Sequence, residues 1–171
     1  SSFSAGVFLI VALNLTNEAF EISHNSLIGL LWIIIGVLGL VGLFKLLPLF
    51  HHHHSNCQEH HHHGKRDARK IILSDAIHNL GDGVLLVASF GVSVELGIIT
   101  TFGIFIHEFI QEISEFFVLK ESGFSTRKAL LVNLATSTTI LIGALGAFYA
   151  TNTFHILELP LIGIAAGSFL E

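Results

Sequence analysis

Charged residues are scarce in this chain of 171 residues, and cysteine, proline and methionine are nearly or wholly absent. Lysine, arginine, aspartate and glutamate make up 12% of the sequence, well below the roughly 25% of a soluble domain. The single cysteine excludes a disulfide within the chain. The net charge of −5 provides no basic domain that would neutralise phosphates, so we expect no nucleic-acid partner.

Hydrophobic residues, in contrast, make up 51% of the chain and fall into six long apolar runs. These runs cover residues 3–20, 27–50, 71–94, 96–119, 129–151 and 155–170. Most approach the ~20 residues that a helix needs to cross ~30 Å of hydrocarbon. The sequence therefore predicts an all-α fold, a polytopic transmembrane helical bundle with about six spans.

The basic residues all fall on one side of the membrane if the six spans alternate in direction. They are Lys45, Lys65, Arg66, Arg69, Lys70, Lys120, Arg127 and Lys128. Basic residues concentrate at the cytoplasmic ends of spans, so the loops at 51–70 and 120–128 are expected in the cytoplasm. The chain then divides into two transmembrane helices (1–50), a cytoplasmic loop (51–70) and the remaining spans (71–171).

The predicted cytoplasmic loop is rich in histidine, with two runs of four histidines on either side of Cys57 and Glu59. Imidazole, thiolate and carboxylate groups are the usual ligands of Zn²⁺. We interpret the loop as a weak metal-capturing segment whose affinity falls as imidazoles protonate below a pH of about 6.5. The alternative is a low-complexity expansion without a function.

Ionisable side chains lie inside two neighbouring apolar runs, where each costs roughly 2.5–3.5 kcal/mol to insert into a bilayer. In the run 71–94, Asp75, His78 and Asp82 have the spacing i, i+3, i+7. This spacing places them on one face of a helix, with Asn79 beside them.

The run 96–119 carries a second set of polar residues on adjoining strips of a helix, namely His107, Glu108, Gln111, Glu112 and Glu115. A short connection makes the two runs antiparallel neighbours, so their imidazoles and carboxylates meet at one depth. This arrangement predicts a divalent-metal site within the membrane. The alternative is a pair of polar stripes that only pack against each other.

Other polar positions are assigned to packing. Asn133, Thr136 and Ser137 share one side of the run 129–151, and we expect them to form hydrogen bonds between helices. Asn14 belongs to a plain packing helix in the first run.

The strings HNLGDG at 78–83 and HEFIQE at 107–112 resemble the paired motifs of the ZIP family of divalent-metal transporters. The His-rich loop before the first motif resembles the loop of one subfamily. The resemblance covers nearly the whole chain, in register with the family's second to seventh helices. We therefore expect a fragment of a bundle of eight helices.

The resemblance implies a homodimer in the lipid bilayer of the plasma (inner) membrane. Its substrate would be Zn²⁺, or Fe²⁺ or Mn²⁺, moved into the cytoplasm as cargo, with no separate cofactor and no catalysis. The resemblance implies that His78, Asp82 and His107 bind the ion and that Asn79 and Glu108 line an adjacent second site. Gln111 and Glu112 complete the predicted metal-binding set. Because Gln111 is neutral and coordinates weakly, we expect one strong site.

Three other functions remain open at this point. A metal-dependent hydrolase within the membrane would also bury histidine and acids, but HEFIQ has Gln111 where the zinc motif HExxH has its second histidine. A metal-sensing membrane protein would bind the ion without flux. An exporter would differ only in the direction of flux.

Overall fold

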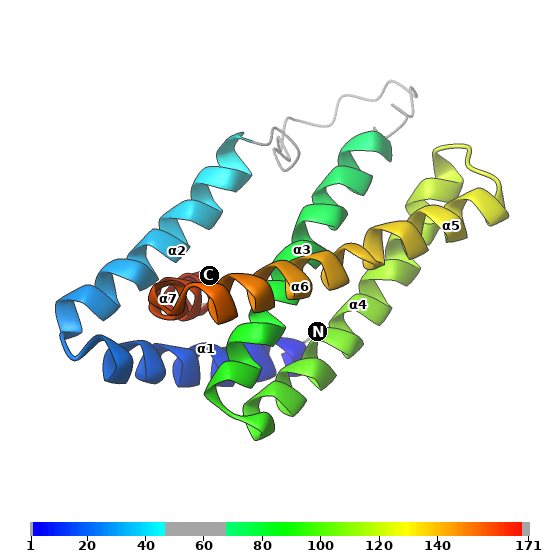
Figure 1. The fold of residues 1–171 in the computed structure, drawn as a ribbon. Coiled ribbons are helices and arrows are strands. Elements are labelled where there is room, and N and C mark those ends of the chain that lie inside the picture. Colours follow the sequence, from blue (N-terminus) through cyan, green and yellow to red (C-terminus); the bar gives the residue numbers. More distant parts are fainter. Residues whose placement is uncertain (1, 47–67, 169–171) are drawn as a thin grey trace.

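The computed structural model describes residues 2–46 and 68–168 of the chain (Figure 1). Over these ranges the chain is helical and contains no strand. The helices are α1 (Ser2–Ser23), α2 (Ser26–Leu46), α3 (Ala68–Val92), α4 (Val94–Glu121), α5 (Thr126–Ser137), α6 (Thr139–Thr153), the 3-10 helix η1 (His155–Leu157) and α7 (Glu158–Ser168). The predicted all-α fold is confirmed. The predicted His-rich loop lies almost entirely outside the described residues.

Four helical segments are long and apolar enough to cross a bilayer, namely Ala5–Ser23, Ala68–Val92, Val94–Glu121 and Thr126–Thr153. Two shorter apolar segments, Ser26–Gly39 and His155–Gly167, accompany them in the described part of the chain. Large apolar side chains point outward from the bundle; Phe102 and Phe105, for example, are 64% and 66% exposed. An apolar exterior of this kind matches a lipid environment, so the fold is that of a helical membrane bundle.

Helix α3 lies at the centre of the bundle and packs against α1, α4, α5, α6 and α7 (Figure 1). Its neighbour α4 follows after a turn at Ser93, whose side-chain oxygen accepts a hydrogen bond from the backbone N–H of Leu96 at 3.0 Å. This N-cap satisfies a backbone donor that would otherwise be unpaired at the start of α4. The short turn makes α3 and α4 antiparallel neighbours, as the sequence predicts.

Helices α3 and α6 cross at glycines, so their backbones touch directly. A Cβ atom added at Gly83 of α3 would overlap the carbonyl oxygen of Ile140, and one added at Gly143 of α6 would overlap that of Leu80. Small residues permit this close approach in a membrane bundle. The reciprocal contact fixes the height of α3 against α6, and with it the height of the polar residues of α3.

The run 129–151, predicted as one span, is divided at Thr138 into α5 and α6. At this point threonine hydroxyl groups compete with backbone N–H groups for the carbonyl oxygens of the helix. Thr136, Thr138 and Thr139 each donate to the carbonyl three residues earlier, at 2.6–2.8 Å. Such bonds compete with the regular helix ladder, which accounts for the interruption.

The last run, 155–170, is likewise less regular than predicted. It begins with the single turn η1, and the helix α7 starts only at Glu158. Pro160 falls in the first turn of α7, where the missing backbone N–H of proline costs nothing. The proline therefore fits the beginning of a helix and not its interior.

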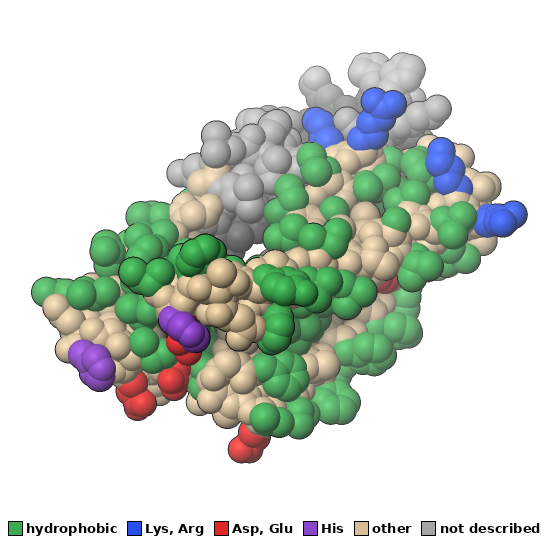
Figure 2. All heavy atoms as spheres, in the orientation of Figure 1, with side chains coloured by type: hydrophobic (Ala, Val, Ile, Leu, Met, Phe, Trp, Pro, Cys, Tyr) green, Lys and Arg blue, Asp and Glu red, His purple; other side chains and the backbone are tan. Residues whose placement is uncertain are grey.

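Charged side chains are segregated along the long direction of the helices. The described basic residues lie at the end of α2, the start of α3, the end of α4 and the start of α5: Lys45, Arg69, Lys70, Lys120, Arg127 and Lys128. Figure 2 shows lysine and arginine at one end of the molecule and acidic and histidine side chains toward the other. This partition agrees with the alternation of spans that the sequence predicts.

Candidate metal centre

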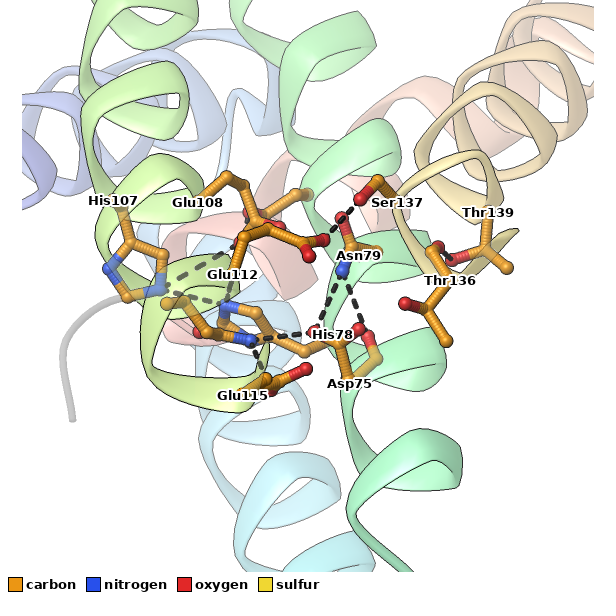
Figure 3. A network of polar contacts seen from close by, with 12 residues as sticks. Asp75, His78, Asn79, His107, Glu108, Glu112, Glu115, Thr136, Ser137 and Thr139 are labelled. Atoms are coloured by element: carbon orange, nitrogen blue, oxygen red, sulfur yellow. Dashed lines mark hydrogen bonds and ion pairs between the residues drawn. The ribbon is translucent and has the colours of Figure 1, made fainter. Parts of the chain in front are cut away.

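The imidazoles of His78 on α3 and His107 on α4 face each other across the interface between these helices (Figure 3). Their Nε2 atoms are 3.1 Å apart. Glu108 lies beside them, with its Oε1 atom 3.8 Å from His78 Nε2 and 4.0 Å from His107 Nε2. Asp82 adds a fourth donor, since its Oδ2 atom is 3.9 Å from His78 Nε2. Two nitrogen and two oxygen donors therefore converge from two helices.

The spacing of these donors is close to that of a zinc shell. In a tetrahedral site with bonds of about 2.0–2.1 Å, neighbouring donor atoms are about 3.3 Å apart. The observed separations of 3.1–4.0 Å bracket this value. One ligand atom each from His78, His107 and Glu108 lie within 4.8 Å of one another. Small side-chain movements would bring the donors onto one ion.

Several oxygen atoms of this site are buried without a hydrogen-bond partner among the described residues. They include Asp82 Oδ2 and both carboxylate oxygens of Glu108. The side chains of Asp82 and Glu108 are only 2% and 13% exposed. A buried carboxylate without partners is costly, and a bound cation removes that cost. The carboxylates thus have the environment that a divalent cation requires.

Asp75 joins the two helices through hydrogen bonds to two amide side chains. Its Oδ1 atom accepts from Asn79 Nδ2 at 3.0 Å and from Gln111 Nε2 at 2.7 Å. Because Asp75 offers only acceptors here, these bonds fix which end of each amide is nitrogen. The carbonyl oxygen of Asn79 is buried and unpaired as a result, so it remains available as a ligand.

Glu112 turns toward α5 rather than toward the paired imidazoles. Its Oε1 atom accepts a hydrogen bond from the hydroxyl of Ser137 (Figure 3). Its backbone oxygen accepts one from the side-chain amide of Asn133 at 2.8 Å. The predicted bonds between helices are therefore present for Ser137 and Asn133. Thr136 instead donates to carbonyls of its own helix.

A groove of about 340 Å³ runs along α4 beside the paired imidazoles. Its lining consists of His107, Ile110, Gln111, Ser114 and Glu115. These residues follow the helical spacing i, i+3, i+4, i+7, i+8, so the polar members form a row that leads away from His107. Helix α1 contributes an apolar contact, since the ring of Phe8 meets the ring of His107 edge-on at 5.6 Å.

The structure brings together six of the seven residues predicted to bind metal and places Glu112 apart from them. His78, Asp82, His107 and Glu108 form the donor cluster. Asn79 and Gln111 lie on the same two helices, and both donate hydrogen bonds to Asp75. Asp75 was not among the predicted ligands. Its spacing with His78 and Asp82, noted in the sequence, places it on the predicted metal-binding face of α3 and was the signal that could have added it.

The fold and the site together define a helical membrane protein with a partly buried cluster of nitrogen and oxygen donors. Residues 51–171 match the profile of the family described as ZIP Zinc transporter. This match covers more than half of the chain, and the chain therefore belongs to the ZIP family. The family is one of metal transporters rather than of enzymes.

Three curated relatives illustrate the similarity. The chain is 37% identical to zinc transporter ZIP4 of Homo sapiens over 100 aligned residues. These residues make up 58% of this chain and 15% of the relative. It is 32% identical over 100 residues to zinc transporter ZIP10 of Mus musculus, covering 58% and 12%. It is 34% identical over 100 residues to metal cation symporter ZIP8 of Rattus norvegicus, covering 58% and 21%. The chain thus spans between 12% and 21% of the length of these relatives. No solved structure matches it.

Proposed function

We propose that the chain forms the ion-conducting part of a Zn²⁺ transporter, with Fe²⁺ and Mn²⁺ as further substrates. The observation that carries this proposal is the convergence of His78, His107 and Glu108 from two helices within a bundle whose exterior is apolar. The relatives named as zinc transporters and as a metal cation symporter support the same substrate class. The ion passes between α3 and α4.

The donor chemistry suits transport, which requires both binding and release. Imidazole nitrogens favour Zn²⁺ and its neighbours over Ca²⁺ and Mg²⁺, which prefer shells made of oxygen. Carboxylates offset the charge of an ion that has lost its water. The described residues supply no thiolate near the cluster, and a cage of thiolates would hold Zn²⁺ too firmly to release it.

We further propose that flux is directed into the cytoplasm. This direction is the one that the resemblance to the ZIP family implies. The basic residues indicate only which end of the bundle faces the cytoplasm. The plasma (inner) membrane and the homodimer remain predictions from the resemblance, and the capture of metal by the His-rich loop remains a prediction from its sequence.

Uptake into proteoliposomes tests the proposed function. The variant Glu108→Gln keeps the shape of the side chain and removes its charge, and Glu95→Gln makes the same change on the exposed first turn of the same helix. We expect Zn²⁺ uptake to fall at least tenfold in Glu108→Gln and to be unchanged in Glu95→Gln. Equal uptake by both variants would contradict a transport site at Glu108.

A further inference from the structure

Asp75 has a carboxylate oxygen that the described contacts do not use. The residue is only 2% exposed, and its Oδ2 atom has no hydrogen-bond partner among the described residues. Its Oδ1 atom, by contrast, accepts two hydrogen bonds from amide groups. A buried carboxylate oxygen without a partner is unfavourable unless a cation compensates for it. Asp75 therefore points to a ligand of its own.

A second carboxylate lies close to Asp75 because both bind the same nitrogen. Gln111 Nε2 donates to Asp75 Oδ1 at 2.7 Å and to Glu115 Oε1 at 3.3 Å. The amide has two N–H groups, so it can serve both carboxylates at once. Figure 3 shows Asp75 on α3 and Glu115 on α4 turned toward the space between the helices. Two like charges held this close favour a divalent cation between them.

The pair lies on the side of the donor cluster that is nearer to the basic end of the bundle. Glu115 is in the groove that begins at His107, roughly 12 Å farther along α4 in the direction of Lys120. Asp75 is likewise displaced from His78 toward Arg69 at the start of α3. The groove thus runs along α4 from His107 of the donor cluster to Glu115 of the carboxylate pair.

From these observations we propose that Asp75 and Glu115 form a second divalent-cation site, made of oxygen donors alone. An ion held between His78 and His107 moves to this site along the groove. The direction of that movement rests on the proposed function, whereas the binding of a cation at the site does not. Oxygen donors bind Zn²⁺ more weakly than imidazole nitrogens, which favours onward release.

Cadmium NMR of the whole protein in detergent micelles, with Cd²⁺ as the probe, tests the site. Cadmium bound only to oxygen resonates upfield of cadmium bound to nitrogen. The donor cluster and the His-rich loop both contain histidine, so an upfield signal distinguishes the Asp75–Glu115 site from them. We expect one upfield resonance in the unmodified protein, lost in Glu115→Gln and in Asp75→Asn. The first of these variants leaves both hydrogen bonds to Asp75 Oδ1 in place.

Two comparisons make the outcome decisive. The upfield resonance should persist in His78→Ala, because that variant alters only the donor cluster. Absence of the resonance, its persistence in Glu115→Gln, or its loss in His78→Ala would each overturn the second site. If the resonance behaves as expected but the protein conducts no Zn²⁺, the proposed function fails and the site stands. If the protein conducts Zn²⁺ but shows no upfield resonance, the second site fails and the proposed function stands.

Discussion

The Nε2 atoms of His78 and His107 lie 3.1 Å apart, although the residues are 29 positions apart in the chain. At this distance one imidazole can donate its proton to the other, or both can direct a lone pair at a shared cation. The second arrangement makes the two residues a unit. Their contributions to ion transport should therefore depend on each other.

The variants His78→Ala and His107→Ala test this dependence. Each should lower kcat/KM for Zn²⁺ uptake by at least about tenfold, because loss of a ligand should cost no less than the 10–100-fold typical of outer-shell partners. The double variant should lose little more than either single variant, since residues that share one ion are not additive. His155→Ala, which removes an exposed histidine between α6 and α7, is the control. Losses that multiply would indicate two independent sites.

Competition between metals follows from the donor set. Cd²⁺ and Zn²⁺ accept imidazole nitrogen readily, whereas Mg²⁺ and Ca²⁺ prefer shells of oxygen. We therefore expect Cd²⁺ to inhibit uptake of labelled Zn²⁺ strongly, Mn²⁺ and Fe²⁺ to inhibit it less, and Mg²⁺ and Ca²⁺ to have little effect at equal concentration. Strong inhibition by Mg²⁺ that persists in Glu115→Gln would indicate a transport site without the two imidazoles.

The contact between α3 and α6 gives a prediction about stability. Gly143→Ala would place a methyl group against the carbonyl of Leu80, and overpacking of this kind costs roughly 1–3 kcal/mol. Gly146→Ala on the same helix meets nothing within 4 Å and should stabilise the helix by roughly 0.5–1 kcal/mol. Thermal unfolding in detergent measures both. Similar melting temperatures for the two variants would argue against the close crossing.

A hydrogen bond between helices can be tested with two adjacent threonines. Thr139 Oγ1 donates to the backbone oxygen of Ala76 on α3 at 2.8 Å, whereas the exposed Thr138 bonds only within its own segment. Thr139→Val should lower the free energy of unfolding by about 0.6 kcal/mol, the average for such bonds in membrane bundles. Thr138→Val should have a smaller effect. An equal decrease in the free energy of unfolding of both variants would mean that the decrease comes from the local backbone and not from the bond between helices.

Periodicity in the sequence accounts for much of the candidate site. The spacing of His78 and Asp82 places them on one face of α3, and the short turn at Ser93 brings that face against α4 at matched height. His107 and Glu108 meet them there. These relationships need only a helix and its nearest neighbour, so a single sequence is sufficient to predict them.

Relationships with more distant helices could not be predicted in the same way. Glu112 differs from Glu108 by one helical turn, yet it bonds to Ser137 because α5 happens to lie beside it. The nitrogen of the Gln111 amide faces Asp75 because it donates a hydrogen bond to that carboxylate. The periodicity of the sequence predicts which face a side chain lies on, but not how its amide is oriented. The break at Thr138 arises from hydroxyl groups that bind nearby carbonyls, an effect that a hydropathy pattern does not contain.

The position of the ion itself is the most direct test of a shared site between α3 and α4. Crystals of the protein grown with Zn²⁺ would reveal bound zinc by anomalous X-ray scattering at the zinc edge. We predict a peak between the two helices, about 2.0–2.1 Å from the Nε2 atoms of both His78 and His107. Strong peaks confined to the His-rich loop or the outer surface, with none between these imidazoles, would contradict the shared site.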